Sequence, residues 1–178
     1  MDIRPTKTKV ALKNALIAFL KKKPVNQITV SEVAKAANVG RGTFYLHYRD
    51  IFDLYDDLVN DLYREMELFF DQAYPSGDDS NLMHLINLLT TYIEQEKELF
   101  LLLNRPEDHG KTFRKFKELF TKKVLFEEHP VNDSEYDAVE SMFIVSGVIG
   151  VLEDWLMDGI QIPQKSLAAH LHRLVGKF

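Results

Sequence analysis

The chain has no cysteine among its 178 residues. It therefore has no disulfide framework, no thiolate nucleophile and no thiolate metal ligand. The histidines are scattered, and His170 and His172 lie two residues apart, which puts them on different faces of a helix. The sequence contains no His-x-x-x-His pair, no Glu-x-x-His pair and no glycine-rich phosphate loop. These absences predict no metal, no cofactor and no catalytic residues, and they disfavour a small helical enzyme.

Long apolar runs are also missing. The most apolar segment, residues 142–152, is too short to cross a bilayer. The N-terminal residues are polar and lead into an amphipathic helix instead of the apolar core of a secretory signal. We therefore expect a cytoplasmic protein with no membrane partner. A chain of this length is sufficient for one domain, or for a small domain joined to a larger one.

The net charge of −5 is distributed unevenly along the chain. Residues 1–50 carry ten Lys or Arg against three acidic residues, a net of +7, whereas the remaining residues carry twelve against twenty-four, a net of −12. A basic N-terminal third on an acidic body favours a domain that docks on phosphates. The alternative is a basic face that is merely solvated. Arg4, Lys7 and Lys9 are either a disordered basic end or an arm that reaches DNA.

Apolar residues recur at helical spacing along the whole chain, and no strand pattern competes with them. The spacing predicts seven helical segments: 4–23, the pair of short helices within 29–48, 50–73, 81–104, 111–126, 134–159 and 163–176. The loops between them contain the clusters 74–79, 105–110 and 127–133. Asp50 is the expected N-cap of the helix over 50–73. The fold class is all-α.

Residues 29–48, TVSEVAKAANVGRGTFYLHY, read as two short helices joined by a tight turn. Thr29 and Glu32 have the spacing of a capping box at the start of the first helix. Asn38 and Gly40 tolerate positive φ and interrupt it. Phe44 and Tyr48, four residues apart, anchor the second helix inward. The segment is a candidate helix-turn-helix, although a small solvated helical hairpin would show a similar pattern.

The outward residues of the second helix suit DNA contact. A helix-turn-helix places the N-terminal part of its second helix in the major groove. Arg41 is placed to reach a base edge, because its guanidinium matches the two acceptors of guanine. Thr29, Tyr45 and His47 are better placed to donate hydrogen bonds to phosphate oxygens.

The run from Thr29 to Tyr55 resembles the N-terminal domain of the TetR family of bacterial transcriptional regulators. Nine residues match the pattern typical of that family as they stand: Thr29, Ala34, Ala37, Val39, Gly42, Thr43, Tyr45, His47 and Leu54. Asn38 replaces the usual turn glycine, Gly40 replaces a capping Ser, and Ile51 replaces a Lys that often touches phosphate, a contact that Arg49 is positioned to take over. The expected DNA-binding residues are Thr29, Arg41, Gly42, Thr43, Tyr45, His47 and Arg49.

The resemblance, which is specific over residues 8–60, implies two domains. Residues 1–49 would form a three-helix helix-turn-helix DNA-binding domain with the start of a connecting helix, 50–73. Residues 50–178 would form a helical bundle for dimerisation and ligand binding. The implied function is a homodimeric regulator, more often a repressor, that is released from a palindromic operator on double-stranded DNA by a small-molecule effector.

The segment MFIVSGVIGVLEDWL is apolar on nearly all faces, so its helix must be buried on more than one side. Small residues in it would let another helix approach closely. We therefore expect this helix and the last one to pair with their copies in a second subunit, although a central core helix would show the same pattern. The candidate interface residues are Ser146, Gly147, Gly150 and Trp155.

Aromatic residues are frequent in the C-terminal part of the chain, where they are either plain core or the lining of an effector pocket. The candidate effector-binding residues are His84, Tyr92, Phe116 and Trp155. The rival function is a DNA-bound interaction protein that takes no small ligand, with its acidic body recruiting another protein.

Overall fold

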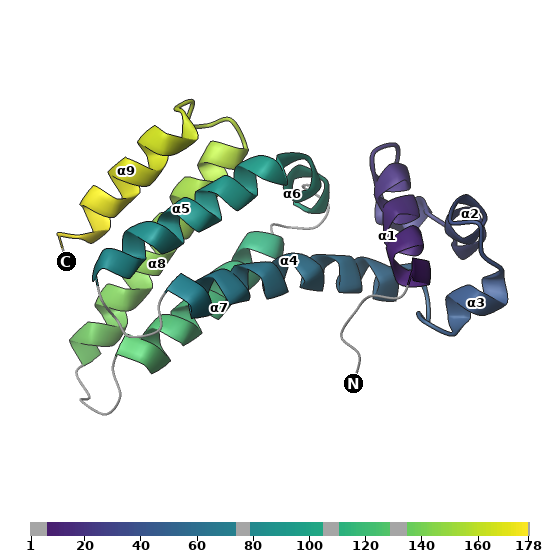
Figure 1. Ribbon diagram of the computed structural model, residues 1–178, viewed down its shortest axis with the longest axis horizontal. Helices are drawn as coiled ribbons and strands as arrows, with labels where there is room; N and C mark the ends of the chain where they lie inside the picture. The colour runs from purple at the N-terminus through teal and green to yellow at the C-terminus, as the bar shows by residue number, and fades with distance from the viewer. Residues whose placement is uncertain (1–6, 74–78, 105–110, 129–134, 178) are drawn as a thin grey trace. The chain divides into compact units, whose positions relative to one another are not determined.

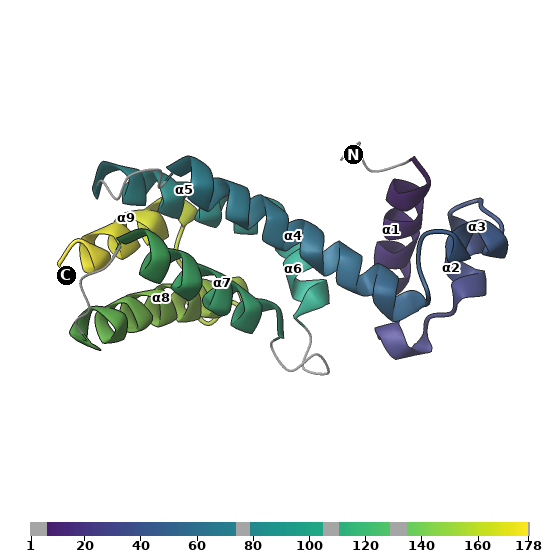
Figure 2. The same cartoon turned by 90° about the horizontal axis from the view of Figure 1, so that it is seen from below.

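The computed structural model describes residues 7–73, 79–104, 111–128 and 135–177, and every regular element in these ranges is helical (Figures 1 and 2). This confirms the all-α class. The elements are α1 (Lys7–Leu20), the 3-10 helix η1 (Val25–Gln27), α2 (Val30–Ala36), α3 (Arg41–Tyr45), α4 (Ile51–Ala73), α5 (Asp79–Gln95), α6 (Lys97–Leu103), α7 (Lys111–Glu128), α8 (Glu135–Leu156) and α9 (Gln164–Val175).

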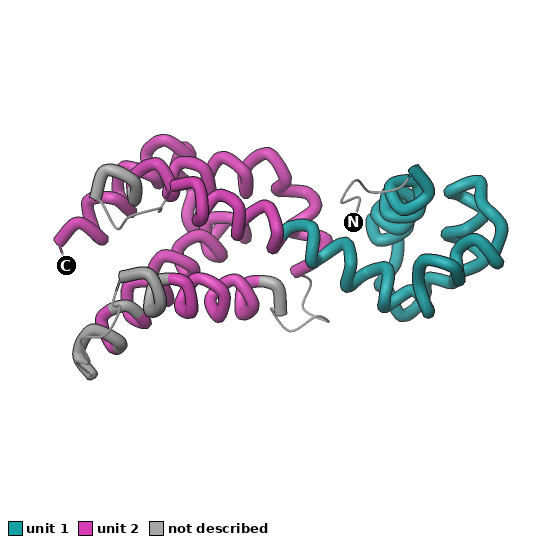
Figure 3. The backbone as a smooth tube through the Cα atoms, turned by 60° about the horizontal axis from the view of Figure 1, so that its bottom comes forward, with its two compact units in different colours: residues 1–62 teal, residues 63–178 magenta. Residues whose placement is uncertain are grey.

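The chain forms two compact units, residues 1–62 and 63–178, drawn in different colours in Figure 3. In the first unit α1 packs against α2, and α2 against α3. The apolar faces of these helices and of the N-terminal half of α4 meet in one core. Its fully buried side chains are Leu12, Leu16, Val33, Phe44 and Leu54.

The second unit is a bundle in which α5 packs along α9 and α7 packs along α8, as Figure 1 shows. Its centre is aromatic. The Phe116 ring lies 4.8 Å from the Tyr63 ring and 5.8 Å from the Phe100 ring, measured between centroids. The Tyr63–Phe116 contact is edge-to-face, an arrangement that aromatic rings prefer to direct stacking.

The predicted single helix over 81–104 is wrong, because the structure contains two helices there, α5 and α6, separated at Glu96. Glu96 has φ −98 and ψ 17, outside the helical range. No glycine or proline marks the break, so the apolar spacing runs across it without interruption.

The other boundaries agree with the sequence to within a few residues, with one addition. The first helix ends at Leu20, and η1 follows Pro24 where only an ending was predicted. Arg4, in the predicted start of the first helix, lies outside the described residues, as do 74–78, 105–110 and 129–133 of the predicted loops. Among the described helices, none has the length and apolar character needed to cross a membrane.

Candidate nucleic-acid interface

The capping box at the start of α2 is present. The Thr29 hydroxyl oxygen accepts a hydrogen bond from the Glu32 backbone N–H at 3.3 Å, and the Glu32 carboxylate accepts one from the Thr29 backbone N–H at 2.9 Å. The Thr29 hydroxyl also donates to Glu32 at 2.8 Å. A hydroxyl has only one proton to donate. A contact from Thr29 to phosphate would therefore replace its bond to Glu32.

Glu32 also holds the end of the preceding segment. Lys23 donates to its carboxylate at 2.8 Å. The hydrogen bonds from Lys23 and Thr29 lower the pKa of Glu32 from 4.5 to about 2. Glu32 is therefore charged throughout the physiological range, where it fixes both the start of α2 and the loop before it.

Asn38 produces the turn between α2 and α3. Its φ of 56 lies in the left-handed region, as expected for an Asn at this place. Gly40, in contrast, has an extended backbone with φ −72 and ψ 152, so it needs no glycine conformation. It stands at the N-cap of α3 without a side-chain cap, which agrees with the expected weak cap.

The inward and outward residues of α3 separate as the spacing predicts. Phe44 and Tyr48 are buried. The exposed residues Arg41, Gly42, Tyr45 and Leu46 share one face, because an α-helix turns by about 100° per residue. We call these four residues the recognition face.

Two candidates lie beside the recognition face and not on it. Thr43 and His47 are half-buried, so only part of each side chain is available to a partner. The His47 ring lies 6.4 Å from that of Tyr48. Leu46, which lies on the recognition face, was not among the candidates expected from the sequence.

Gly42 has no structural reason to be a glycine. A methyl group added at its Cα would meet no atom within 4 Å, and its φ is not in the left-handed region. A glycine inside a helix costs about 1 kcal/mol relative to alanine. A close approach by a partner would explain why the position is bare.

We expect Gly42→Ala to separate stability from DNA binding. The substitution should leave the free energy of unfolding unchanged or raise it, because alanine favours the helix. It should weaken DNA binding by about 1–3 kcal/mol, typical of one overpacked group. Thermal unfolding and a binding titration on the same sample test both effects. Unchanged affinity would show that DNA stays clear of Gly42.

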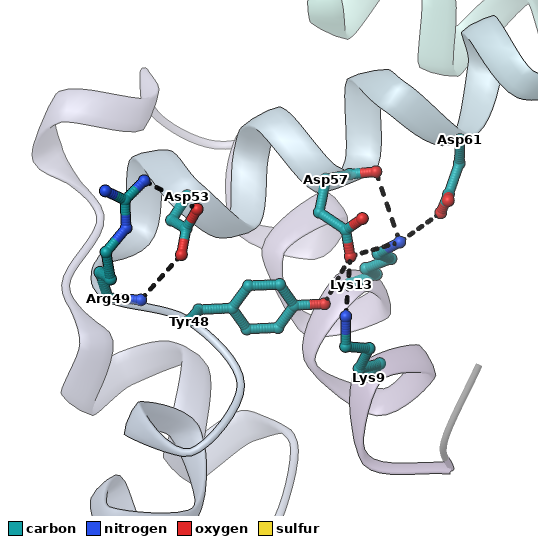
Figure 4. Close-up of polar contacts among 7 residues, drawn as sticks. All are labelled: Lys9, Lys13, Tyr48, Arg49, Asp53, Asp57 and Asp61. Carbon is teal, nitrogen blue, oxygen red and sulfur yellow. Dashed lines mark hydrogen bonds and ion pairs between the residues drawn. The ribbon is translucent and has the colours of Figure 1, made fainter. Parts of the chain in front are cut away.

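Arg49, the expected replacement for the missing phosphate-binding Lys, already has a partner. Its guanidinium lies 3.2 Å from the Asp53 carboxylate, and its backbone N–H donates to the same carboxylate at 2.9 Å (Figure 4). These bonds lower the pKa of Asp53, so the carboxylate remains charged. The Arg49 side chain is 87% exposed, so it remains accessible to a phosphate as well. Asp50 caps α4 through a 2.8 Å bond from the Asp53 N–H, as predicted.

Replacing Asp53 with Asn should tighten DNA binding several-fold, because it frees Arg49 and removes a negative charge from the interface. The gain should disappear as salt is raised, since salt screens exposed charges. Asp56→Asn is the matched control, because it removes the same charge one turn further along α4. Equal gains from both variants would mean that Arg49 is not involved.

A cluster of charges ties α1 to α4 within the first unit. The Lys13 ammonium lies 2.9 Å from the Asp57 carboxylate and also pairs with Asp61, while the Tyr48 hydroxyl donates to Asp57 at 2.8 Å (Figure 4). Burial raises the pKa of Asp57, but the bonds from Lys13 and Tyr48 and the charges of Lys13 and Lys9 outweigh it and keep the pKa below its ordinary value of 3.8. Tyr48 thereby links the end of the helix-turn-helix to this cluster.

Lys13→Met should lower the free energy of unfolding by about 1–3 kcal/mol at neutral pH, because it removes the nearest cation from the partly buried Asp57 and leaves only the more distant Lys9. Since the folded pKa of Asp57 is depressed, the stabilisation is present above about pH 3.8 and is lost as the pH falls further. Urea titrations at pH 7 and pH 3 test both statements. Lys22→Met, at an exposed lysine, is the control, and an equal loss in both variants would contradict the role of Lys13.

The structure divides the four effector candidates between different places in the second unit. Tyr92 lies against Phe100, with ring centroids 5.9 Å apart, and Phe116 is fully buried beside the same Phe100. His84 is exposed. Trp155 lines a separate cleft of about 360 Å³ and donates from its indole N–H to the Ile162 carbonyl at 2.9 Å.

A second cavity in the same unit was not identifiable from the sequence. Its volume is about 70 Å³, and its lining is entirely apolar. The lining residues come from five helices: Phe70, Leu85, Ile86, Leu89, Phe120, Ile144, Val145, Val148, Ile149 and Val175. Each belongs to an ordinary apolar stripe, so nothing in the spacing separates them from core.

Three of the four interface candidates, Ser146, Gly147 and Gly150, lie on the uncovered face of α8, whereas Trp155 is half-buried at the cleft. Gly147 and Gly150 are exposed, with nothing within 4 Å of an added methyl group, and Ser146 is half-exposed. Val139 and Phe143, on the same helix, are each 65% exposed. The opposite face of α8, which includes Val145, Ile149 and Leu152, is buried in the bundle. Within the described part of the chain, no group of three or more His, Asp or Glu side chains is arranged to hold a metal ion.

Comparisons with known proteins agree for both units. Residues 14–58 match a family model described as bacterial regulatory proteins, tetR family, and residues 80–177 match one described as a transcriptional regulator C-terminal region. The HTH-type transcriptional regulator YxbF of Bacillus subtilis (strain 168) is 28% identical over 132 residues, which cover 72% of this chain. The chain spans about a third of the length of the curated relatives it matches, 34% of one and 38% of another.

Solved structures share the fold over nearly the whole chain. A TetR transcriptional regulator from Streptococcus agalactiae 2603V is 28% identical with a TM-score of 0.60, covering 95% of this chain and 93% of that one. NalD of Pseudomonas aeruginosa, the secondary repressor of the MexAB-OprM multidrug efflux pump, is 22% identical with a TM-score of 0.68, covering 96% and 94%.

Proposed function

Since the chain belongs to the TetR family of bacterial regulatory proteins and is a transcriptional regulator with a DNA-binding domain, we propose that it acts as a homodimeric repressor. Two copies of the recognition face bind the two halves of a pseudo-palindromic operator on double-stranded DNA. A small-molecule effector that binds the second unit releases the protein from the operator.

The observation that supports this most directly is the recognition face itself. It presents a guanidinium, a phenol and an exposed aliphatic side chain on one side of a short helix whose other side is buried. A guanidinium in the major groove pairs with the two acceptors of guanine. The net charge of +7 over residues 1–50 favours approach to phosphates.

The uncovered face of α8 supports the dimer. Large apolar side chains exposed beside two bare glycines are typical of a surface that another helix covers. A second copy of α8 is the occupant we propose, because regulators of this family act as dimers. A two-fold dimer requires an operator with two-fold symmetry, with half-sites centred about 34–36 Å apart or a further turn beyond.

Selection of bound fragments from a random DNA pool tests this function. We expect the purified protein, at near-physiological salt, to enrich an inverted repeat, because non-specific binding is weak under those conditions. Enrichment of a sequence without two-fold symmetry would contradict the dimeric mode. If the folded dimer enriched no sequence, the DNA contacts would be electrostatic only, and an interaction protein would be the better description.

The apolar cavity supports an effector of apolar chemistry. A polar ligand would lose its hydrogen bonds to water in a site that offers no polar side chain in return. At about 70 Å³ the cavity is smaller than an ordinary ligand site, so an effector has to separate the helices that line it. Phe70 lines it from α4, a helix shared by both units. An effector that binds the separated state more tightly than the DNA-binding state shifts the population away from DNA binding. The size of the shift depends on the ratio of the two affinities.

Release from the selected operator by decanol is the corresponding test. Val148→Phe, which fills the cavity from α8, should reduce release, whereas Leu68→Phe, an enlargement at an exposed residue of α4 outside the lining, should preserve it. Equal release of both variants from the operator would show that the effector binds at another site. If no apolar compound released the protein, the proposal of an effector at this cavity would be wrong.

A further inference from the structure

Leu46 is the most exposed large apolar side chain in the described part of the chain, at 82%. A single exposed leucine needs no explanation by itself, because folded proteins expose many apolar atoms. The exposure of Leu46 is informative because of where this residue lies. It lies on the recognition face, beside the guanidinium and the phenol that are proposed to meet DNA.

The backbone fixes the direction of the Leu46 side chain. Leu46 has φ −72 and ψ −20, and its N–H donates to the Gly42 carbonyl at 3.2 Å, so the helical path of α3 continues through it. Leu46 therefore projects about 40° from the direction of Gly42, four residues earlier. Side chains on a helix lean towards its N-terminus, over the preceding turn. Leu46 and the bare surface of Gly42 therefore lie on the same side of α3, with no side chain within 4 Å of a methyl group added at Gly42.

The recognition face therefore has an apolar part beside a hydrogen-bonding part. Arg41 and Tyr45 provide the hydrogen-bonding side of the recognition face, while Leu46 and Gly42 provide a side with no polar side-chain atom. In the major groove, the only large apolar group that a base pair presents is the C5-methyl of thymine. The leucine side chain has no donor or acceptor for a base edge, but it can pack against this methyl group.

We propose that Leu46 packs against the C5-methyl of a thymine in each half-site and thereby selects thymine at that position. The inference rests on the proposed function, because it requires the recognition face to enter the major groove. It adds a specificity-determining residue to those that pair through hydrogen bonds. The thymine that Leu46 contacts then also lies against the bare surface at Gly42.

Uracil substitution tests the contact, because deoxyuridine lacks only the C5-methyl. Each thymine of the selected operator is replaced in turn by deoxyuridine, and the affinities of the wild type and of Leu46→Ala are measured. We expect one symmetry-related position at which uracil weakens wild-type binding about threefold to tenfold, as expected from the loss of one buried methyl group. Leu46→Ala should bind thymine and uracil alike at that position. It should retain sensitivity to guanine at the position read by Arg41.

Leu68→Ala, at an exposed leucine of α4 in the second unit, is the control and should behave as wild type. Circular dichroism and sedimentation establish that each variant is folded and dimeric. If no position were sensitive to uracil, or if Leu46→Ala kept the sensitivity, the inference would be overturned while an enriched inverted repeat would leave the proposed function intact. If no sequence were enriched, the proposed function would fail first and this inference with it.

Discussion

Gly147→Leu is expected to convert the protein from a dimer to a monomer in sedimentation experiments. The substitution has room within one chain, because nothing lies within 4 Å of an added methyl group, and leucine favours a helix more than glycine does. The isolated subunit should therefore fold at least as stably as before. A bulky side chain at the point where two α8 helices approach each other would keep them apart, so the damage falls on the interface alone.

The same variant should lose operator binding. Two linked heads bind a repeated site more tightly than one head by a factor of about 10² to 10⁴, and that factor disappears when the dimer dissociates. Gln95→Leu, which adds the same side chain at an exposed position of α5, is the control and should leave both the dimer and the affinity unchanged. An intact Gly147→Leu dimer would remove this glycine from the interface.

Arg41→Ala should weaken operator binding by about 1–3 kcal/mol and relax the preference for one base. The reason is that a bidentate pair to guanine is lost, whereas contacts to phosphate are kept. Lys35→Ala gives the contrast, because Lys35 is an exposed cation of α2 and not a residue of the recognition face. Its loss should weaken binding to all sequences alike and reduce the dependence on salt.

Selection of bound fragments with each variant distinguishes the two roles. Arg41→Ala should enrich a repeat that has lost its preference at one symmetric position, and Lys35→Ala should enrich the wild-type repeat at lower yield. A uniform loss of affinity in Arg41→Ala, with every base preference kept, would identify Arg41 as a phosphate contact.

The local features of the DNA-binding unit followed from the sequence because they depend on neighbouring residues. The capping box at Thr29, the positive φ at Asn38 and the Asp50 cap on α4 each involve groups within three residues of one another. Burial of Phe44 and Tyr48 followed from helical spacing alone. Interactions between residues this close in the sequence can be predicted without a structure.

Features that depend on tertiary contacts could not be predicted from the sequence. Lys13 meets Asp57 across 44 residues of sequence, and the interior position of a lysine contradicts its usual exposure. The break at Glu96 has no glycine, proline or other local marker in the sequence. The apolar cavity consists of residues from five helices that all read as core. Leu46 was missed because an apolar residue on a short helix is ordinarily expected to face inward.

The charge cluster around Asp57 determines where this regulator can be cut and rejoined. A chimera that gives the DNA-binding unit to another effector-binding bundle would be joined at residue 50 if the predicted domain boundary were used. That junction would leave Lys13 and Tyr48 behind without Asp57 and Asp61, and foreign residues would stand opposite a buried lysine. A junction after Leu62 transfers the whole cluster together with the N-terminal half of α4. Grafts made there should keep the stability and the operator preference of the parent.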